Sequence, residues 1–250
     1  MEESWEAQIS AVAALDEPTR RRLYGYVVRR PEPVSRDEAA AALDLPRTTA
    51  AFHLDRLVDE ELLDVVYQRL TGRTGPGAGR PSKLYRRSDQ QVAVSLPRRR
   101  YDLAGRLLSN ALDQAERSGD SPRAVLDQRA YEMGRALGET ACGAAGDQDT
   151  RDTALQVLEA HGFEPRVEGE AVTLANCPFH VLAQEQSELV CGMNLRLLDG
   201  LLAGVACTGL TAHLHPTPAH CCVRLEPAAS ASAPVRVAGA PERDQTDGDQ

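Results

Sequence analysis

The sequence lacks the segments that carry a protein into or across a membrane. No apolar run approaches the roughly 18 residues that a membrane-spanning helix needs. A signal peptide begins with a positively charged stretch before an apolar one, whereas residues 1–16 are acidic. Both absences predict a cytoplasmic protein without a membrane partner.

Cysteine is missing from the first 141 residues. Five of the six cysteines then lie within residues 175–222, together with four of the six histidines. Structural disulfides are rare in the cytoplasm, and the short C-x2-C spacing of a zinc ribbon is missing as well. Instead, 13 residues separate Cys177 from Cys191, and 29 separate Cys191 from Cys221. This spacing predicts metal ligands or redox groups drawn from separate loops, whereas we expect Cys142 and Cys207 to be buried and inert.

Aromatic residues make up 4% of the chain, so Leu, Val and Ala must build its cores. The chain also lacks a Walker loop, a G-x-G-x-x-G fingerprint and a nucleophile–base pair, and these absences predict that it is not an enzyme. An enzyme with a small-molecule or tetrapyrrole pocket in its second half, tethered by the first half, stays an alternative.

Charge is divided unevenly along the chain. The net charge is −9, but residues 1–100 carry +2 and residues 101–250 carry −11. Residues 65–100 hold nine basic side chains and one acidic side chain. Because phosphate binding follows a local patch rather than the total, this distribution predicts that the first part of the chain binds nucleic acid.

A helix-turn-helix is predicted over residues 33–63. Ser35 and Glu38 have the spacing of a capping box, which starts a short helix over residues 36–43. A turn at residues 44–46 leads to a second helix that runs to about residue 61. In it Ala50, Leu54 and Leu57 share one face and should pack inward. The outward face would then carry small polar side chains and arginine, which suits a recognition helix.

A wing is predicted after the second helix. Residues 62–70 and 83–87 have the composition of strands, and the loop between them contains four glycines and two arginines. A helix-turn-helix followed by such a hairpin is a winged helix, whose partner is double-stranded DNA. The predicted DNA-binding residues are Arg47, Thr48, Thr49, Phe52, His53, Arg56, Arg73, Arg80 and Lys83.

The whole chain is predicted to be α+β, with four parts. They are a winged helix-turn-helix domain (1–92), a linker and dimerisation helix (93–120), a C-terminal α+β sensor domain (121–226) and a disordered tail (227–250). The helix over residues 98–117 should pair two subunits, because helix-turn-helix proteins usually read two half-sites as a homodimer. Further helices are predicted over residues 120–146, 152–161 and 188–205, and strands over 163–167, 171–175 and 222–225.

The run from Leu45 to Leu57, followed by Glu61-Leu62-Leu63, resembles the ArsR-type winged-helix regulators. The segments Asn176–Phe179, Val190–Leu195 and His220–Leu225 resemble the ligand region of SufR-type iron–sulfur repressors, and the similarity covers roughly residues 10–225. The resemblance implies a dimer that carries a [4Fe-4S] cluster, binds the promoter of the iron–sulfur assembly genes and releases it when the cluster is lost.

The resemblance implies that Cys177, Cys191 and Cys221 bind the cluster. Some members of the family carry a further cysteine at the position of Leu174, so the fourth ligand is open. The candidates are Cys222, His180, His213, His215 and His220. Two other sensors stay open beside the cluster, namely a regulator that binds zinc or another thiophilic metal and a thiol–disulfide switch. The operator and the direction of regulation also stay open.

Overall fold

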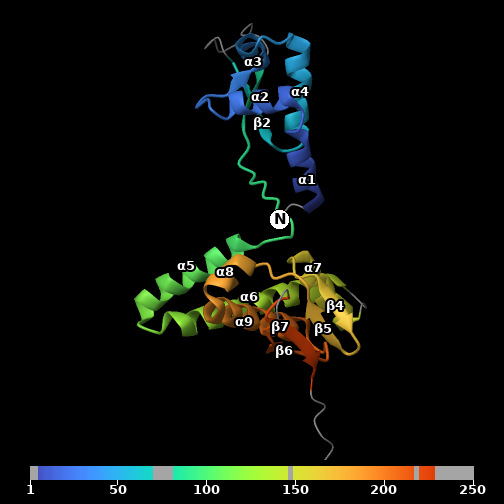
Figure 1. The fold of residues 1–250 in the computed structure, drawn as a ribbon. Coiled ribbons are helices and arrows are strands. Elements are labelled where there is room, and N and C mark those ends of the chain that lie inside the picture. The colour runs from blue at the N-terminus through green and yellow to red at the C-terminus, as the bar shows by residue number, and fades with distance from the viewer. Residues whose placement is uncertain (1–4, 70–80, 146–148, 217–219, 229–250) are drawn as a thin grey trace, which may run out of the picture. The chain divides into compact units, whose positions relative to one another are not determined.

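The structure is a computed structural model that describes residues 5–69, 81–145, 149–216 and 220–228. The chain forms two compact units, Met1–Leu96 and Pro97–Gln250 (Figure 1). None of the helices in the described ranges is long and apolar enough to cross a membrane. The predicted tail from residue 229 onward lies outside the described residues.

Helices and a small sheet alternate in the N-terminal unit. Its elements are α1 (Trp5–Ala14), α2 (Pro18–Val27), β1 (Val34–Ser35), α3 (Arg36–Leu43), α4 (Arg47–Asp59), β2 (Leu63–Gln68) and β3 (Ser82–Arg87). α2 is separate from α1 because Pro18 begins a new helix, and the Glu17 side chain accepts hydrogen bonds from the amides of Thr19 and Arg20. The capping box of Ser35 and Glu38 starts α3 as predicted.

The sheet of the N-terminal unit is antiparallel with the order β1-β3-β2. β3 lies in the middle, and its Leu84 and Tyr85 are each 2% exposed. Leu23, Leu54 and Leu57 from the helices are fully buried in this unit. The helix-turn-helix therefore rests on a core of aliphatic side chains, which the shortage of aromatic residues predicted.

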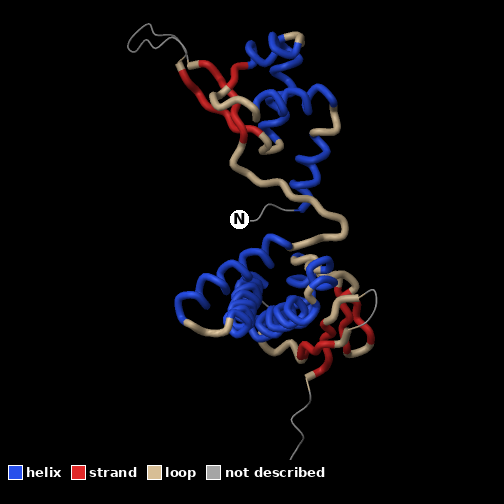
Figure 2. The backbone as a smooth tube through the Cα atoms, turned by 60° about the vertical axis from the view of Figure 1, so that its left-hand side comes forward, coloured by secondary structure: helices blue, strands red, loops and turns tan. Residues whose placement is uncertain are grey.

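The C-terminal unit joins a stack of helices to a second sheet. Its elements are α5 (Tyr101–Ser118), α6 (Pro122–Ala145), α7 (Thr150–Ala160), β4 (Pro165–Glu168), β5 (Ala171–Leu174), α8 (His180–Glu185), α9 (Ser187–Val205), β6 (Leu210–Leu214) and β7 (Val223–Pro227). The sheet is antiparallel with the order β4-β5-β7-β6. α5 packs on α6, α6 on α9, and α9 on the sheet, and Figure 2 shows these helices to one side of the strands.

Helices α6 and α9 approach each other closely through glycines. Gly134 and Gly138 of α6 face backbone atoms of α9, and Gly200 and Gly204 of α9 face backbone atoms of α6, so that an added Cβ would collide at each position. Glycine is needed here because the two backbones leave no room for a side chain. This contact holds α9, and with it Cys191, in a fixed position against the rest of the unit.

Helix α5 belongs to the core of the C-terminal unit. Leu103, Ala104 and Leu107 are buried in the same core as side chains of α6 and α9. The helix predicted as a separate linker thus packs into the second unit, because α6 covers its apolar face. The exposed side of α5 still carries Leu112, which is 55% exposed.

Candidate functional site

Helix α4 presents the predicted DNA-binding surface. Ala50, Leu54 and Leu57 are fully buried, so the opposite side of the helix faces solvent. Arg47, Thr48, Phe52 and Arg56 are exposed there, and Thr49 is partly exposed. Phe52 is 66% exposed, which is unusual for a large apolar side chain and suits contact with the methyl group of a thymine.

The basic side chains of this surface are held by carboxylates of the same unit. Arg47 pairs with Asp37, and Arg56 pairs with Glu60. Lys83 Nζ lies 2.6 Å from Asp55 Oδ1, which also accepts a hydrogen bond from the Tyr85 hydroxyl at 2.7 Å. Exposed ion pairs stabilise a protein by only about 0–1 kcal/mol, so a DNA phosphate can take the place of these carboxylates.

One of the predicted DNA-binding residues has another orientation, and two others fall in a segment that the structure does not describe. The side chain of His53 is 14% exposed, and its Nδ1 lies 3.6 Å from Glu17 Oε2. The ring thus faces the start of α2, which differs from the predicted outward orientation. Arg73 and Arg80 lie outside the described residues.

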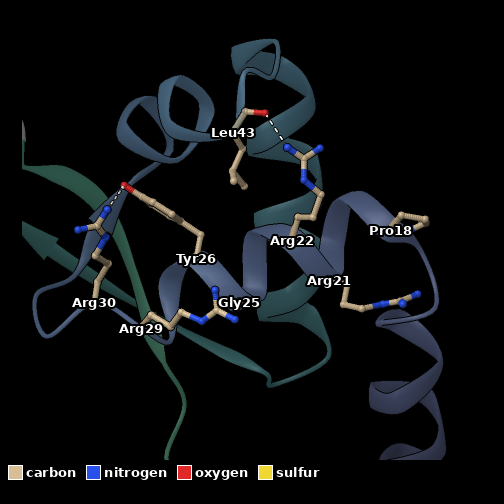
Figure 3. A pocket seen from close by; sticks show the side chains of 8 residues that line it. All are labelled: Pro18, Arg21, Arg22, Gly25, Tyr26, Arg29, Arg30 and Leu43. Atoms are coloured by element: carbon tan, nitrogen blue, oxygen red, sulfur yellow. Dashed lines mark hydrogen bonds between the residues drawn. The ribbon is translucent and has the colours of Figure 1, made fainter.

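A basic hollow on α2 is a feature that the sequence analysis did not identify. It is lined by Pro18, Arg21, Arg22, Gly25, Tyr26, Arg29, Arg30 and Leu43, none of which is acidic (Figure 3). Arg22 donates a hydrogen bond to the carbonyl of Leu43, and the Arg30 guanidinium lies 4.7 Å from the centre of the Tyr26 ring. These contacts orient the arginines without neutralising them, so the hollow adds positive potential to the unit. The two runs of arginine in the sequence, at residues 20–22 and 29–30, could have indicated this hollow.

Four thiols of the C-terminal unit come together from three segments. Cys177 follows β5, Cys191 lies near the start of α9, and Cys221 and Cys222 directly precede β7. The amide of Cys221 donates to the carbonyl of Leu174 at 2.9 Å, which extends the pairing of β5 with β7. This pairing places the two cysteine-bearing loops side by side.

The thiols are linked in a hydrogen-bonded chain. Cys177 bonds with Cys221, Cys221 with Cys222, and Cys222 with Cys191. Cys177 and Cys221 are buried, whereas Cys191 and Cys222 are partly exposed, and all are free of disulfides. We call these four residues the thiol cluster.

The environment favours protonated thiols. The hydrogen bond with Cys221 and burial raise the pKa of Cys177. The bond with Cys177 lowers the pKa of Cys221, but the bond with Cys222 and burial raise that pKa more. Burial also raises the pKa of Cys191. A cation must therefore displace protons from these thiols in order to bind, which makes its affinity dependent on pH.

Polar groups beside the thiol cluster suit thiolate ligands. The amides of Phe179 and Val223 donate to the sulfurs of Cys177 and Cys221. Asn194 is fully buried, its Nδ2 lies 3.2 Å from the Cys221 sulfur, and its Oδ1 has no hydrogen-bond partner among the described residues. Hydrogen bonds to sulfur are a means by which proteins tune iron–sulfur centres. Sequence analysis missed Asn194, although its spacing from Cys191 places both on one face of α9.

The remaining candidate residues lie around the thiol cluster or away from it. His213 is exposed, and its Nε2 lies 2.9 Å from the Thr211 hydroxyl on β6. His215 and His220 are exposed and line a surface hollow that reaches Cys221. His180 is the first residue of α8 and is partly exposed. Cys142 and Cys207 are exposed, so the prediction that they are buried is wrong.

The donor set fits a soft metal or an iron–sulfur cluster, because both prefer thiolates. Within the described ranges, no three His, Cys, Asp or Glu side chains already have the arrangement of a metal-ion site. Binding would therefore require the four side chains to rearrange as their protons leave.

A family model described as a helix-turn-helix domain matches residues 15–66. The matched residues include α2, α3 and α4, with the exposed surface described above. The N-terminal unit thus contains a helix-turn-helix domain, and the protein is a DNA-binding transcriptional regulator. Searches for similar curated proteins and solved structures found no match.

Proposed function

We propose that this regulator binds its operator as a homodimer, with an affinity that depends on a [4Fe-4S] cluster. The ligands are Cys177, Cys191, Cys221 and Cys222, and the regulated genes are those of iron–sulfur assembly, which the protein represses. The observation that carries the proposal is the convergence of four thiols in a chain that also contains a helix-turn-helix domain.

The thiol cluster has the chemistry that such a sensor needs. Its four sulfurs match the four thiolates that hold a [4Fe-4S] cluster, which would supply a redox-sensitive, oxidant-labile group. Two thiols are buried and two are partly exposed, so one side of the site stays accessible to oxidants. The amides of Phe179 and Val223 and the side chain of Asn194 stabilise the negative charge of the sulfurs.

Cys222 is the fourth ligand in this proposal. It joins Cys191 to Cys221 in the thiol chain, whereas the ring of His213 bonds with a side chain of β6. In this proposal a thiol from the opposite loop takes the place of the cysteine that some SufR-type regulators carry at the position of Leu174.

The test is the iron and sulfide content of the protein purified without oxygen. We expect equal amounts of iron and sulfide, a brown colour, and operator binding in a mobility-shift assay that changes when the cluster is removed. Cys221→Ser should abolish iron binding, whereas Cys142→Ser, at an exposed cysteine, should retain it. A wild-type protein that takes up no iron after anaerobic reconstitution would contradict the proposal.

The direct bonds between thiols also favour a second candidate, a regulator that senses zinc or thiol oxidation. Neighbouring reduced thiols such as those of Cys177 and Cys221 can lose two electrons and two protons to an oxidant and form a disulfide. One zinc per chain without sulfide, or a mass loss of two hydrogens after treatment with a mild peroxide, would identify this candidate instead.

A further inference from the structure

The segment that enters α5 is bound to the loop that carries Cys177. The amide of Arg100 donates to the carbonyl of Pro178 at 3.0 Å, and the Asn176 side chain donates to the carbonyl of Arg98 at 2.9 Å. The Arg99 guanidinium donates to the Asn176 side-chain oxygen and to the carbonyl of Cys177, the latter at 3.0 Å. Three consecutive residues, 98–100, thus contact three consecutive residues of the cysteine loop, 176–178.

The buried side chain of Asn176 lies at the centre of these contacts, which are closely packed. Asn176 is 6% exposed, and its Nδ2 also donates to the carbonyl of Gly162 at 2.6 Å. Gly162 has a φ of +87°, and a Cβ at this position would lie 2.9 Å from the Cβ of Arg98. Breaking the hydrogen bonds of Asn176 would leave a buried amide unsatisfied, which is unfavourable. We therefore expect residues 98–100 and residues 176–178 to move together.

These contacts involve the segment that joins the two units along the chain. Residues 97–100 form the covalent connection from the N-terminal unit to α5. Cys177 lies between the two loop residues that hold Arg98 and Arg100, and its own carbonyl is a partner of Arg99. A shift of the Cys177 backbone therefore displaces the partners of the segment that leads to the DNA-binding unit.

We propose that Arg99 and Asn176 are positioning residues that transmit the state of the thiol cluster to the helix-turn-helix unit. The inference rests on the proposed function and names its route of regulation. The bond of the Cys177 thiol with Cys221 occurs together with the contacts in which residues 176–178 hold residues 98–100. Ligation of Cys177 turns its thiol away from Cys221, which shifts the 176–178 loop and so reorients the connecting segment.

The test compares the operator Kd of the full chain before and after cluster removal. The ratio of the two values measures the coupling. Arg99→Gln and Asn176→Ala should reduce this ratio by about tenfold or more, with unchanged iron and sulfide per chain. Arg99→Lys keeps the charge but loses the fork of donors, and it should recover part of the ratio. Arg166→Gln removes an equal charge from an exposed position on β4 and should leave the ratio within about twofold of wild type.

Hydrogen exchange at the amide of Arg100 gives a readout that does not depend on DNA. This amide bonds with Pro178 while the thiols are unligated, so it should exchange more slowly in the cluster-free protein than in the cluster-loaded protein, and rapidly in both states of Arg99→Gln. Circular dichroism shows whether Asn176→Ala has kept its fold.

The outcomes separate this inference from the proposed function. If wild type loads a cluster and shows a ratio above one, but Arg99→Gln and Asn176→Ala keep that ratio, the positioning role is overturned and the proposed function stands. If wild type holds zinc or a reversible disulfide instead of a cluster, the same ratio is measured for those two states, and its loss in the variants supports the positioning role alone. A wild-type ratio of one for every state of the thiols overturns both.

Discussion

The two units place their functional residues in opposite ways. In the N-terminal unit, five of the predicted DNA-binding side chains (Arg47, Thr48, Thr49, Phe52 and Arg56) lie on the exposed face of one helix, α4, within a short stretch of sequence. In the C-terminal unit, four thiols come from three segments spread over residues 177–222, and two of them are buried. The first surface tolerates changes in tertiary packing as long as its helix stays folded. The thiol cluster exists only while the sheet and α9 keep their relative positions.

The largest effect should come from the packing of α6 against α9. Gly200→Leu would place a side chain against the backbone of Tyr131, so we expect it to destabilise the C-terminal unit by about 3 kcal/mol or more. Urea unfolding followed by circular dichroism should show this loss of stability, and iron analysis of the purified variant should show the loss of iron binding. Trp5, the one tryptophan of the chain, should report an unchanged transition of the N-terminal unit by fluorescence.

Gly105→Leu is the control for this comparison, because nothing lies within 4 Å of a Cβ at Gly105. It should leave stability unchanged or raise it by up to about 1 kcal/mol, since leucine favours helix more than glycine does. If Gly200→Leu moved the Trp5 transition as well, the two units would not be energetically independent.

A smaller effect is expected from the amide beside the thiol cluster. Asn194→Leu keeps the volume of the side chain but removes its hydrogen bond to Cys221. We expect cluster or metal to be held about 10–100-fold less tightly, because partners of metal ligands have effects of this size. The stability of the metal-free protein should change little or rise, since the buried Oδ1 of Asn194 has no partner within the described residues.

Chelator competition measures the affinity in this experiment, and Asn110→Leu, at an exposed position on α5, is the matched control. Equal retention of metal in Asn194→Leu and wild type would show that the buried amide does not stabilise the thiolates. The metal affinity of the thiol cluster would then depend on its cysteines alone. The difference between the two units in their dependence on tertiary packing would be smaller.

Phe52→Ala tests the surface of α4. We expect operator affinity to fall by about tenfold, because losing the recognition of one base pair typically costs about 1–3 kcal/mol. The stability of the N-terminal unit should stay unchanged, since Phe52 is 66% exposed. Fluorescence anisotropy with a labelled operator measures the affinity. Tyr67→Ala, at a side chain that is 65% exposed on β2, is the control, and an equal loss in both variants would argue against a specific role of Phe52.

The smallest effect concerns the start of α2. Hydrogen bonds from the amides of Thr19 and Arg20 lower the pKa of Glu17 to about 2, even though desolvation raises it. A lowered pKa means that the stabilisation is present above the unfolded-state pKa of about 4.3 and is lost as the pH falls toward 2. Glu17→Gln should therefore cost a few tenths of a kcal/mol at neutral pH and nothing near pH 2. Trp5 fluorescence in urea at both pH values measures this, and a loss that stayed constant with pH would exclude the charge as its cause.

Much of the N-terminal unit could be predicted from local signals. The capping box of Ser35 and Glu38, the inward spacing of Ala50, Leu54 and Leu57, and the two strands of the wing are confirmed by the structure. Such signals act between residues a few positions apart, so they can be read without knowing the fold. His53 is the exception, because its orientation depends on Glu17 of another helix.

Several elements of the C-terminal unit were missed for the opposite reason. Helix α8 has six residues and strand β6 has five, and neither has a strong pattern of its own. Helix α8 begins directly after its N-cap residue, Phe179. Strand β6 forms by pairing with β7, for example at Ala212 and Leu225. Short elements of this kind form because their neighbours offer hydrogen bonds and apolar contacts, which no local pattern records.

The sequence by itself determined the helix-turn-helix, its exposed face and the concentration of cysteines in one part of the chain. Only the tertiary structure decided which thiols meet, because the pairing of β5 with β7 and the glycine contact of α6 with α9 join residues far apart in sequence. It also decided that Asn194 lies against Cys221 and that Arg99 reaches the Cys177 loop. Hydrogen bonds and close packing act over a few ångströms of space, so sequence separation does not predict them.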